Sequence, residues 1–526
     1  MFDYAHCSLL QTLAYFDVNT SNLTEQELAL FNQCQALIND TRALGQDDIF
    51  CAIIGEQQDG RDYIDQAIKG GAIIVLAECT TDKLHGEITR ARVGSNTALV
   101  IKFYRLNYHL FALCQYYYQQ PQQYMTMIGV TGTNGKTSTC QIIAKLLEAS
   151  QQTCAVLGTL GAGNVNALSP LANTTPGATQ LHHYLNEFKE NNIANVAMEV
   201  SSHALSQRRI TSNIIDIAVF TNLSRDHLDY HQTMSAYSDA KKELFSENSN
   251  QIAVLNGDDD QAQQWLKSWN EQQTCIVYGK KIKASQYKNF VIAKNITHTS
   301  YGVHFDLITH LGEQKIISPL LGDFNIDNLL AAIAVLLAKK NTLITVAQAV
   351  SQLTPVLGRM ESFREQALPM AVVDYAHTPD ALKNALIACR MHCQGELWVV
   401  FGCGGDRDQG KRPLMGEIAE QLADHIIITN DNPRSEAPEM IATDILVGCI
   451  HAEKITVMLD RKQAVLAALA KAKASDLVLL AGKGHENTIT IGNKIIDYSE
   501  RSVVQHFYKE KVSKNEKHNN NNEDNS

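Results

Sequence analysis

The stretch that decides the fold is MTMIGVTGTNGKTSTCQIIAKLLEAS, residues 125–150. Its apolar start predicts a buried strand, and its amphipathic end predicts a helix. Between them lies the glycine-rich turn Gly129-Val-Thr-Gly132-Thr-Asn-Gly135-Lys136-Thr137. Glycines let backbone N–H groups approach phosphates, and a helix N-terminus favours negative charge. We therefore expect a phosphate-binding loop here.

The loop has the form GxxGxxGKT, because Val130 occupies the position five residues before Gly135, where a glycine is usual. Lys136 can reach the β- and γ-phosphates of a nucleotide, and the Thr137 hydroxyl can bind Mg²⁺. The loop alone predicts only a nucleoside triphosphate, so a motor, a switch, a kinase and a ligase all stay open. We expect ATP to be bound by Gly132, Thr133, Asn134, Gly135, Lys136, Thr137 and Ser138.

Strand-then-helix patterns continue on both sides of this loop. Strands are expected at 49–54 and 72–78 before it, and at 371–377, 397–405, 425–433 and 476–486 after it. The segment 321–340, LGDFNIDNLLAAIAVLLAKK, is expected to form a long buried helix. Ligands of open α/β sheets bind at the carboxyl ends of the strands, and these strands end in Gly, Asp, His or Asn. We expect an α/β fold with a small α/β domain (1–105), a central P-loop ATPase-like domain with a mostly parallel sheet (106–355) and a Rossmann-like domain (356–510). The polar tail 511–526, KVSKNEKHNNNNEDNS, is expected to be disordered.

The 526 residues carry a net charge of −11, which disfavours a general nucleic-acid binder. No run of eighteen apolar residues occurs, so we expect no membrane span, and the N-terminal residues do not resemble a signal peptide. We expect a cytoplasmic monomer whose ligands are small molecules.

A series of motifs in fixed order resembles the Mur ligase family, which are ATP-dependent amide-forming enzymes of peptidoglycan precursor synthesis. The motifs are DTR (40–42), TGTNGKT (131–137), NTTP (173–176), EVSSHAL (199–205), TNLSRDHLDYH (221–231), LGDFNIDN (321–328), GRME (358–361), DYAHTPD (374–380), DNPR (431–434) and AGKGHE (481–486). The resemblance implies a ligase that adds meso-diaminopimelate to the D-glutamate of UDP-N-acetylmuramoyl-L-alanyl-D-glutamate. ATP as cosubstrate would convert the carboxylate to an acyl phosphate, which the amine then attacks.

The resemblance also implies the catalytic residues Lys136, Glu199, His227 and Lys241. Lys241 is expected to react with CO₂ and become N6-carboxylysine, a carbamate that exchanges a cation for an anion. Mg²⁺ would then be bound by Thr137, Glu199, His227 and the Lys241 carbamate. Lys242 is adjacent, and on a helix the two lysines face about 100° apart, so only one can point into the site.

The substrate sites follow from the same motifs. The UDP-sugar dipeptide would contact Thr41, Arg42, Gln57, Asn173, Thr174, Thr175, Ser201, Gln207 and Arg209, although Thr41 and Glu56 replace residues expected in the uracil pocket. The remaining ATP contacts would be Asn325, Arg359 and Asp374. Diaminopimelate would contact Arg407, Asp431, Asn432, Arg434, Gly482 and Glu486.

Three alternatives stay open at this point. A lysine-adding Mur ligase is the nearest, but Arg434 rewards a distal carboxylate and repels an ammonium. Folylpolyglutamate synthetase shares the phosphate loop but is not expected to have the first domain or DNPR. A P-loop nucleotide-binding switch protein would leave Glu199, His227 and Lys241 without a role.

Overall fold

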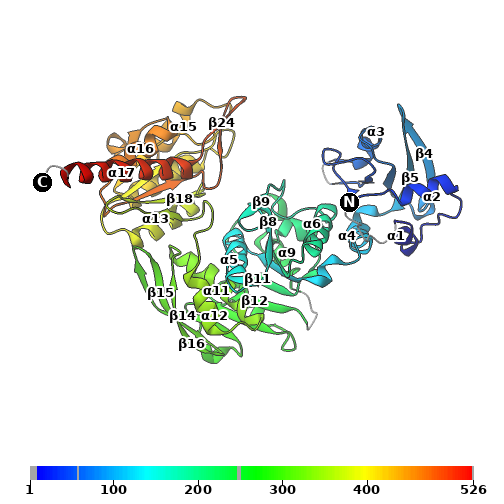
Figure 1. The fold of residues 1–526 in the computed structure, drawn as a ribbon, viewed down its shortest axis with the longest axis horizontal. Helices are drawn as coiled ribbons and strands as arrows, with labels where there is room; N and C mark the ends of the chain where they lie inside the picture. The colour runs from blue at the N-terminus through cyan, green and yellow to red at the C-terminus, as the bar shows by residue number, and fades with distance from the viewer. Residues whose placement is uncertain (1–8, 56–57, 246–249, 524–526) are drawn as a thin grey trace. The chain divides into compact units, whose positions relative to one another are not determined.

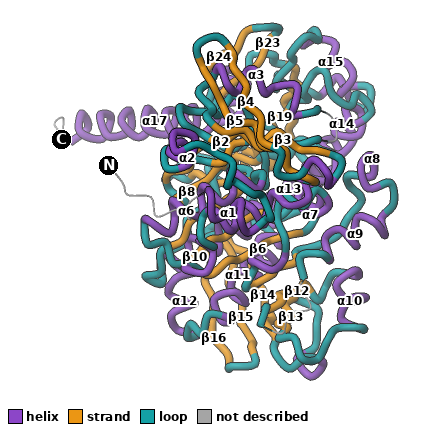
Figure 2. The backbone as a smooth tube through the Cα atoms, turned by 90° about the vertical axis from the view of Figure 1, so that its right-hand side faces the viewer, coloured by secondary structure: helices purple, strands orange, loops and turns teal. Residues whose placement is uncertain are grey.

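The computed structural model describes residues 9–55, 58–245 and 250–523, and of the side chains beyond Lys511 it describes those of Val512 and Ser513. The chain divides into two compact units (Figure 1). Unit 1 comprises Met1–Leu255 and Asp259–Cys275, and unit 2 comprises Asn256–Asp258 and Ile276–Ser526. Helices and strands alternate through both units (Figure 2), as the sequence predicts for an α/β protein. The described residues contain no helix that is long and apolar enough to cross a membrane.

Unit 1 starts with a five-stranded sheet in the order β1-β2-β3-β5-β4, in which only β4 is antiparallel to its neighbour. The expected strands at 49–54 and 72–78 are confirmed as β2 and β3. The sheet consists of β1 (Leu37–Ile38), β2 (Ile49–Ala52), β3 (Ile74–Cys79), β4 (Ile88–Val93) and β5 (Asn96–Tyr104), with helices α1 (Leu9–Tyr15), α2 (Glu25–Phe31), α3 (Ile64–Lys69) and α4 (Leu106–Tyr117).

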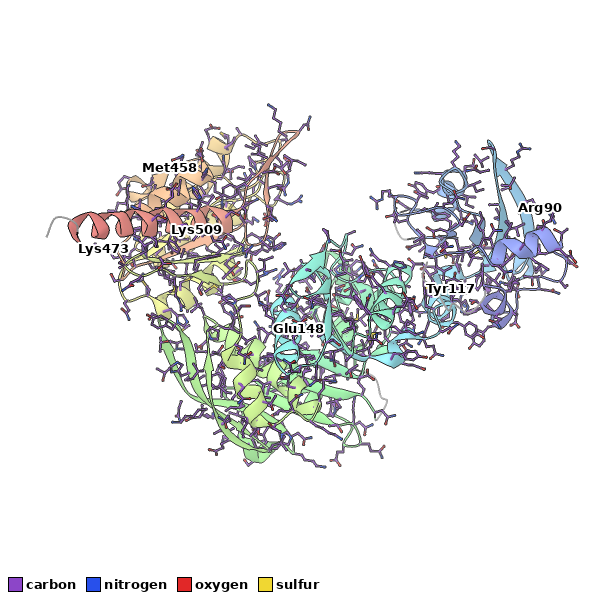
Figure 3. All side chains as sticks on the ribbon, viewed as in Figure 1. Arg90, Tyr117, Glu148, Met458, Lys473 and Lys509 are labelled. Carbon is purple, nitrogen blue, oxygen red and sulfur yellow. The ribbon has the colours of Figure 1, made fainter. Side chains whose placement is uncertain are left out.

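Side chains at the surface and in the core hold these helices to the sheet. Arg90 of β4, labelled in Figure 3, forms an ion pair with Glu27 of α2. The Tyr117 hydroxyl of α4, also labelled, donates to the Gln35 carbonyl at 3.0 Å. Tyr117 is almost fully buried, and its hydroxyl therefore needs such a partner.

The rest of unit 1 is a sheet in the order β12-β11-β6-β10-β7-β8-β9, with the phosphate-loop strand β6 between β11 and β10. The four strands β12, β11, β6 and β10 are parallel, and their carboxyl ends meet at one edge. The strands are β6 (Thr126–Thr131), β7 (Cys154–Gly158), β8 (Gly161–Asn164), β9 (Ala167–Ser169), β10 (Asn195–Glu199), β11 (Ile217–Phe220) and β12 (Ile252–Asn256). The helices are α5 (Lys136–Ala149), α6 (Ala178–Glu190), α7 (Ser202–Ser206), α8 (Leu228–His231), α9 (Met234–Lys242) and α10 (Asp260–Leu266).

Unit 2 begins with strands in the order β16-β15-β14-β13 and a buried helix, α11, over the segment for which the sequence predicts one. Its bounds are β13 (Cys275–Gly279), β14 (Phe290–Thr299), β15 (Gly302–Thr309), β16 (Gly312–Ser318), α11 (Asp323–Ala338) and α12 (Leu343–Ser351). Twelve of the sixteen residues of α11 are buried, which explains its almost wholly apolar sequence.

The second sheet of unit 2 has the order β17-β18-β22-β19-β20-β21 and is parallel except for β17. Leu382, Met415 and Ile441 bury α13, α14 and α15 in one core, and Val465 and Val504 bury α16 and α17 in another. The strands are β17 (Glu361–Phe363), β18 (Met370–Asp374), β19 (Leu397–Phe401), β20 (His425–Ile428), β21 (Thr456–Val457) and β22 (Leu477–Ala481), followed by a hairpin of β23 (Thr488–Ile491) and β24 (Lys494–Asp497). The helices are α13 (Pro379–His392), α14 (Lys411–Leu422), α15 (Pro438–Leu446), α16 (Arg461–Lys471) and α17 (Glu500–Glu523).

The expected disorder of the tail stays a prediction. The structure continues α17 as one helix to Glu523, through residues for which the sequence predicts disorder from position 511 (Figure 1). The helix is already formed and buried at Val504, Phe507 and Tyr508, so extending it needs no new nucleus. The added residues contain no proline or glycine that would end it. The domain boundaries expected near residues 105, 355 and 510 stay predictions.

Candidate active site

The phosphate loop connects β6 to α5 with the backbone that its glycines permit. Gly132 and Gly135 have φ values of 146° and 85°. A Cβ atom on Gly132 would lie 1.9 Å from Thr221 Oγ1, so no side chain fits there. Thr221 Oγ1 donates to the Asn134 carbonyl at 2.6 Å, and the Asn134 N–H donates to Asn222 Oδ1 at 2.9 Å. The segment after β11 thus holds the loop in one shape, with the N-terminus of α5 at its end.

Lys136 is the first residue of α5, and its ammonium reaches back over the loop. Its Nζ donates to the carbonyls of Gly132 and Thr133, each at 2.8 Å. Thr133 also lies against Tyr237, with 3.2 Å between the two hydroxyl oxygens. The predicted phosphate-binding residues therefore form one group in unit 1.

Glu199 lies at the carboxyl end of β10 and is 2% exposed. Its Oε2 accepts from Thr137 Oγ1 at 2.9 Å, and its Oε1 accepts from the Thr159 N–H at 2.8 Å. A Cβ on Gly158 would lie 2.2 Å from Glu199 Oε1, so only glycine leaves room for the carboxylate there. The structure therefore brings together two predicted metal ligands, Thr137 and Glu199.

Lys241 is 1% exposed, whereas Lys242 is exposed to solvent. Lys241 Nζ donates to the Gly132 carbonyl at 2.8 Å and lies 4.3 Å from the ring centroid of Tyr237. Burial lowers the pKa of Lys241 to about 6, with a smaller contribution from the charge of Lys136. An amine with that pKa is largely neutral at pH 7, which is the form that reacts with CO₂. The structure thus separates two lysines that the sequence could not.

His227 is the N-cap residue that precedes α8; it has a positive φ of 52° and is half-exposed. Its ring lies edge-on to His203 at 4.9 Å and to Tyr237 at 5.9 Å between centroids. Tyr237 therefore contacts both Lys241 and the ring of His227. The sequence analysis missed Tyr237, although its position four residues before Lys241 places both on one helix face.

Two of the predicted metal ligands, Thr137 and Glu199, suit a hard divalent cation such as Mg²⁺. Thr137 and Glu199 supply adjacent oxygen atoms, which Mg²⁺ prefers. Within residues 9–55, 58–245 and 250–523, no three side chains of His, Cys, Asp or Glu are grouped closely enough to hold a metal. A carbamate on Lys241 or a nucleotide phosphate would supply a further anionic ligand. Mg²⁺ there would offset negative charge on the reacting groups.

Several residues expected to contact the dipeptide lie around the end of β10. The Thr175 hydroxyl donates to the Glu199 carbonyl at 2.8 Å, and Arg209 Nη1 donates to the Thr175 carbonyl at 3.0 Å. Ser201 Oγ caps α7 by accepting from the Ala204 N–H at 3.1 Å. These contacts place Thr174, Thr175, Ser201 and Arg209 beside Glu199, with the Thr174 hydroxyl 3.1 Å from that of Thr159. Gln207 ends α7, and Asn173 is exposed.

The residues predicted to contact the uridine lie in the first part of unit 1. Arg42 is exposed, and its guanidinium forms a bidentate ion pair with Asp40. The Asp40 carboxylate has a lowered pKa, chiefly because of that hydrogen bond. Thr41 is half-buried beside it, whereas Gln57 and Glu56 lie outside the described residues. Contacts of these residues with a uridine stay predictions.

The remaining ATP residues belong to unit 2. Asp374, at the end of β18, accepts from the N–H groups of Met360 and Ala376 at 2.7 and 2.9 Å, and burial raises its pKa despite the nearby Arg359. The Arg359 guanidinium lies 4.9 Å from the ring of Tyr375. Its buried Nε has no hydrogen-bond partner among the described residues, which fits a guanidinium that binds an anion. Asn325 is buried and donates to the Leu321 carbonyl at 2.9 Å.

The residues predicted to bind the amino acid come together at one edge of the second sheet of unit 2. Arg434 has a positive φ of 51°, and its Nη1 donates to the Gly405 carbonyl at 2.8 Å. Its N–H donates to the Thr490 carbonyl at 3.0 Å, so the β23 hairpin supports it. Asn432 Nδ2 donates to Glu486 Oε2 at 3.0 Å. Arg407, by contrast, is exposed in the loop after β19.

Lys483 is a site residue that the sequence analysis missed. It is 0% exposed, and its Nζ lies 2.6 Å from Glu486 Oε2, 3.1 Å from Asn432 Oδ1 and 3.6 Å from Asp431 Oδ1. Burial opposes ionisation of Glu486, but the hydrogen bond and charge of Lys483 and the hydrogen bond from Asn432 together outweigh burial, so the pKa of Glu486 lies below its usual value. Its position inside the AGKGHE motif (481–486) is the feature of the sequence that could have indicated it.

The comparisons with known proteins agree with this geometry. Residues 130–336 match the Mur ligase middle domain, and residues 358–484 match the Mur ligase glutamate ligase domain. The chain is 42% identical to the UDP-N-acetylmuramoyl-L-alanyl-D-glutamate–2,6-diaminopimelate ligase of Vibrio vulnificus, over 93% of this chain and 98% of that protein. It is 41% identical to the ligase of the same name from Haemophilus influenzae, over 90% and 96%.

Solved structures give the same picture. A structure of a UDP-N-acetylmuramoyl-L-alanyl-D-glutamate–2,6-diaminopimelate ligase matches with a TM-score of 0.65 and 34% identity, covering 91% of this chain and 95% of that one. Mycobacterium tuberculosis folylpolyglutamate synthase shares the fold over 71% of this chain and 91% of its own, with a TM-score of 0.56 and 17% identity. The identity, the coverage and the two matched domains together show that this chain belongs to the Mur ligase family.

Proposed function

We propose that the protein is an ATP-dependent ligase that joins meso-diaminopimelate to the D-glutamate of UDP-N-acetylmuramoyl-L-alanyl-D-glutamate. The observation that carries the choice of amino acid is that a guanidinium and a carboxylate flank one residue: Arg434 Nη1 donates to the Asn432 carbonyl at 3.4 Å, and Asn432 Nδ2 donates to Glu486 at 3.0 Å. Diaminopimelate has a carboxylate and an ammonium at its far end. A guanidinium and carboxylates side by side match those two charges, whereas a lysine side chain would leave Arg434 without an anion.

The chemistry is proposed to take place at the phosphate loop. Lys136 and the N-terminus of α5 would hold the transferred phosphate, and Lys136 would offset the negative charge that develops during transfer. Glu199, Thr137, His227 and the Lys241 carbamate would hold Mg²⁺, whose role is to reduce repulsion between ATP and the substrate carboxylate. The dry surroundings of Lys241 favour its neutral amine and hence the carbamate. Thr175, Ser201 and Arg209 would orient the dipeptide carboxylate for attack on the γ-phosphate.

The residues of unit 2 complete the proposal. Asp374 would accept from the ATP ribose, Arg359 would contact phosphate, and Asn325 would contact the base. Arg407 and Arg434 would hold carboxylates of the incoming amino acid, while Asp431, Asn432, Gly482 and Glu486 would hold its far ammonium. The α-amine would then attack the acyl phosphate, and phosphate would leave. A cytoplasmic location and a monomeric state stay predictions from the sequence.

The test is release of ADP by the purified protein with ATP, Mg²⁺, bicarbonate and UDP-N-acetylmuramoyl-L-alanyl-D-glutamate. The reactions would contain meso-diaminopimelate, L-lysine or no amino acid. We expect turnover with diaminopimelate only. Turnover with lysine and not diaminopimelate would overturn the choice of amino acid, and ADP release that needs no amino acid would favour a nucleotide switch. A folylpolyglutamate synthetase would instead require a folate and glutamate.

A further inference from the structure

A buried ion pair lies directly beneath the loops proposed to bind the amino acid. Arg461, the first residue of α16, is 2% exposed, and Glu500, the first residue of α17, is 0% exposed. Arg461 Nε donates to Glu500 Oε1 at 3.1 Å, and its Nη2 donates to Oε2 at 2.8 Å. The two side chains therefore meet in the two-point geometry that is specific to arginine.

The remaining donors of Arg461 hold two loops. Its Nη1 donates to the Asn430 carbonyl at 2.9 Å, and its Nη2 donates to the Ala481 carbonyl at 2.8 Å. Asn430 immediately precedes Asp431, and Ala481 immediately precedes Gly482. One planar group therefore holds together the starts of the DNPR loop and the GKGHE loop.

The spacing between these loops has little tolerance. A Cβ on Gly482 would lie 2.7 Å from Asp431 Oδ2. Lys483 and Glu486 of one loop reach Asn432 of the other at 3.1 and 3.0 Å. A shift of one loop by about 1 Å would break these contacts, and misplacement of that size can cost about 100-fold in rate.

The charge of Arg461 makes Glu500 necessary to this arrangement. Burial opposes the guanidinium charge, but the surrounding acidic groups, of which Glu500 contributes most, together outweigh burial, so the pKa of Arg461 lies above its usual value. A buried ion pair contributes little net stability compared with apolar packing, yet it is costly to break. The two contacts of Arg461 with backbone carbonyls instead fix backbone positions, which an apolar side chain would not do.

We infer that Arg461, held in place by Glu500, is a positioning residue that fixes the distance between the two amino-acid-binding loops. The inference rests on the proposed function, because it assumes that these loops bind diaminopimelate. Arg461 itself does not contact the amino acid. It acts through the carbonyls of Asn430 and Ala481, and so through the side chains that follow them.

The test compares Glu500→Gln and Arg461→Lys with the unaltered full-length protein. Glu500→Gln removes the compensating charge, and Arg461→Lys keeps a cation but loses the planar fork. We expect the KM for diaminopimelate to rise about 10- to 100-fold in both. The kcat and the KM for ATP should change less than about threefold, since phosphate transfer uses other groups. If Glu500→Gln does not fold, the KM of Arg461→Lys for diaminopimelate still tests the inference.

Asp476→Asn is the matched control. Asp476 is a buried carboxylate just before β22, at the opposite end of the strand that leads to Gly482, and it accepts from the N–H groups of Lys473 and Glu396 at 2.8 and 3.0 Å. Asp476→Asn should lower Tm and leave the KM for diaminopimelate unchanged. If Glu500→Gln and Arg461→Lys likewise lower Tm only, the pair merely stabilises the fold and the inference is wrong.

A second measurement separates this inference from the proposed function. Amide hydrogen exchange needs no substrate, and we expect it to be faster at residues 430–434 and 482–486 in Glu500→Gln than in the unaltered protein or in Asp476→Asn. Unchanged exchange at both loops would overturn the positioning role, whatever the enzyme acts on. If exchange is faster but the protein does not use diaminopimelate, the proposed function is wrong and the positioning role of Arg461 still holds.

Discussion

The phosphate-loop site of unit 1 and the amino-acid loops of unit 2 treat buried positive charge in opposite ways. In unit 1, Lys136 and Lys241 both donate to the Gly132 carbonyl, and the pKa of Lys241 falls to about 6. In unit 2, Lys483 lies within hydrogen-bond distance of Glu486, and Arg461 is paired with Glu500. One site disfavours the charged form of Lys241, whereas the other pairs each of its buried cations with a carboxylate.

The difference follows from what each site has to do. A neutral lysine is open to chemical modification, and the bound anions of ATP and substrate would then complete the charge balance of unit 1. The loops of unit 2 have to discriminate between two similar amino acids, which requires side chains fixed before the ligand arrives. We therefore propose that unit 1 is arranged for chemistry and unit 2 for selection, and the following variants test that contrast.

The largest effect is expected at Lys241. Lys241→Ala removes the carbamate and with it one proposed metal ligand, so kcat should fall about 100- to 1000-fold. Lys242→Ala is the matched control, because Lys242 is adjacent on α9 but exposed, and it should leave kcat within about twofold. Steady-state ADP release measures both. Equal losses in the two variants would remove the distinction between the lysines.

The second effect is expected at Arg434. Arg434→Ala deletes the guanidinium proposed to hold the distal carboxylate, a charged hydrogen bond worth about 1.5–3 kcal/mol, so the KM for diaminopimelate should rise about 10- to 100-fold. The KM for ATP should not change. Initial rates at varied amino acid and varied ATP provide the comparison. A rise in the KM for ATP alone would contradict a role in selection.

A third prediction concerns acid stability of unit 1. His182 of α6 is 0% exposed, its Nδ1 lies 2.8 Å from the Ala178 carbonyl, and burial lowers its pKa from 6.5 to about 4. Between these values the unfolded chain binds a proton that the folded chain does not. The free energy of unfolding should therefore fall by about 1.4 kcal/mol per pH unit as the pH drops from 6.5 toward 4, and it is unaffected above 6.5.

His182→Gln should lack this slope, since it has no group that titrates there. Urea unfolding near pH 7 and pH 5 in a Trp398→Phe background would report on unit 1, because the other two of the three tryptophans, Trp265 and Trp269, lie in it. The same loss of stability with and without His182 would show that another group is responsible.

The smallest effect is expected at Tyr237, whose ring lies over Lys241 and whose hydroxyl lies 3.2 Å from that of Thr133. Tyr237→Phe keeps the ring but loses the hydrogen bond, which is worth about 1 kcal/mol, so kcat should fall about fivefold. Tyr237→Ala should reduce kcat further and make it more dependent on added bicarbonate. If Phe and Ala behave alike, the hydroxyl matters and the ring does not.

Local patterns predicted the sheets, the phosphate loop and the long helix α11 well, because each depends on neighbours in the chain. The choice between Lys241 and Lys242 required the structure, since both fit the same motif and only burial separates them. The expectation of a disordered tail rests on composition alone, whereas the structure continues α17 from the buried turn at Val504 to Glu523.

Residues that act across long distances in sequence were missed for a different reason. Arg461 and Glu500 are 39 positions apart and belong to no motif, and neither has a neighbour that marks it. Lys483 lies within AGKGHE, but the sequence alone predicts that a lysine between two glycines is an exposed loop residue. Pairing of buried charges is decided by tertiary packing, which periodicity and spacing do not report.

The position of Glu500 at the start of α17 has a consequence for how the protein is made. The ribosome synthesises the DNPR and GKGHE loops, and Arg461 between them, before it reaches Glu500. Until then Arg461 lacks the carboxylate with which it pairs, and α17 cannot pack into the core that it shares with α16. A chain cut short before position 500 would therefore contain every proposed amino-acid contact and still bind diaminopimelate poorly.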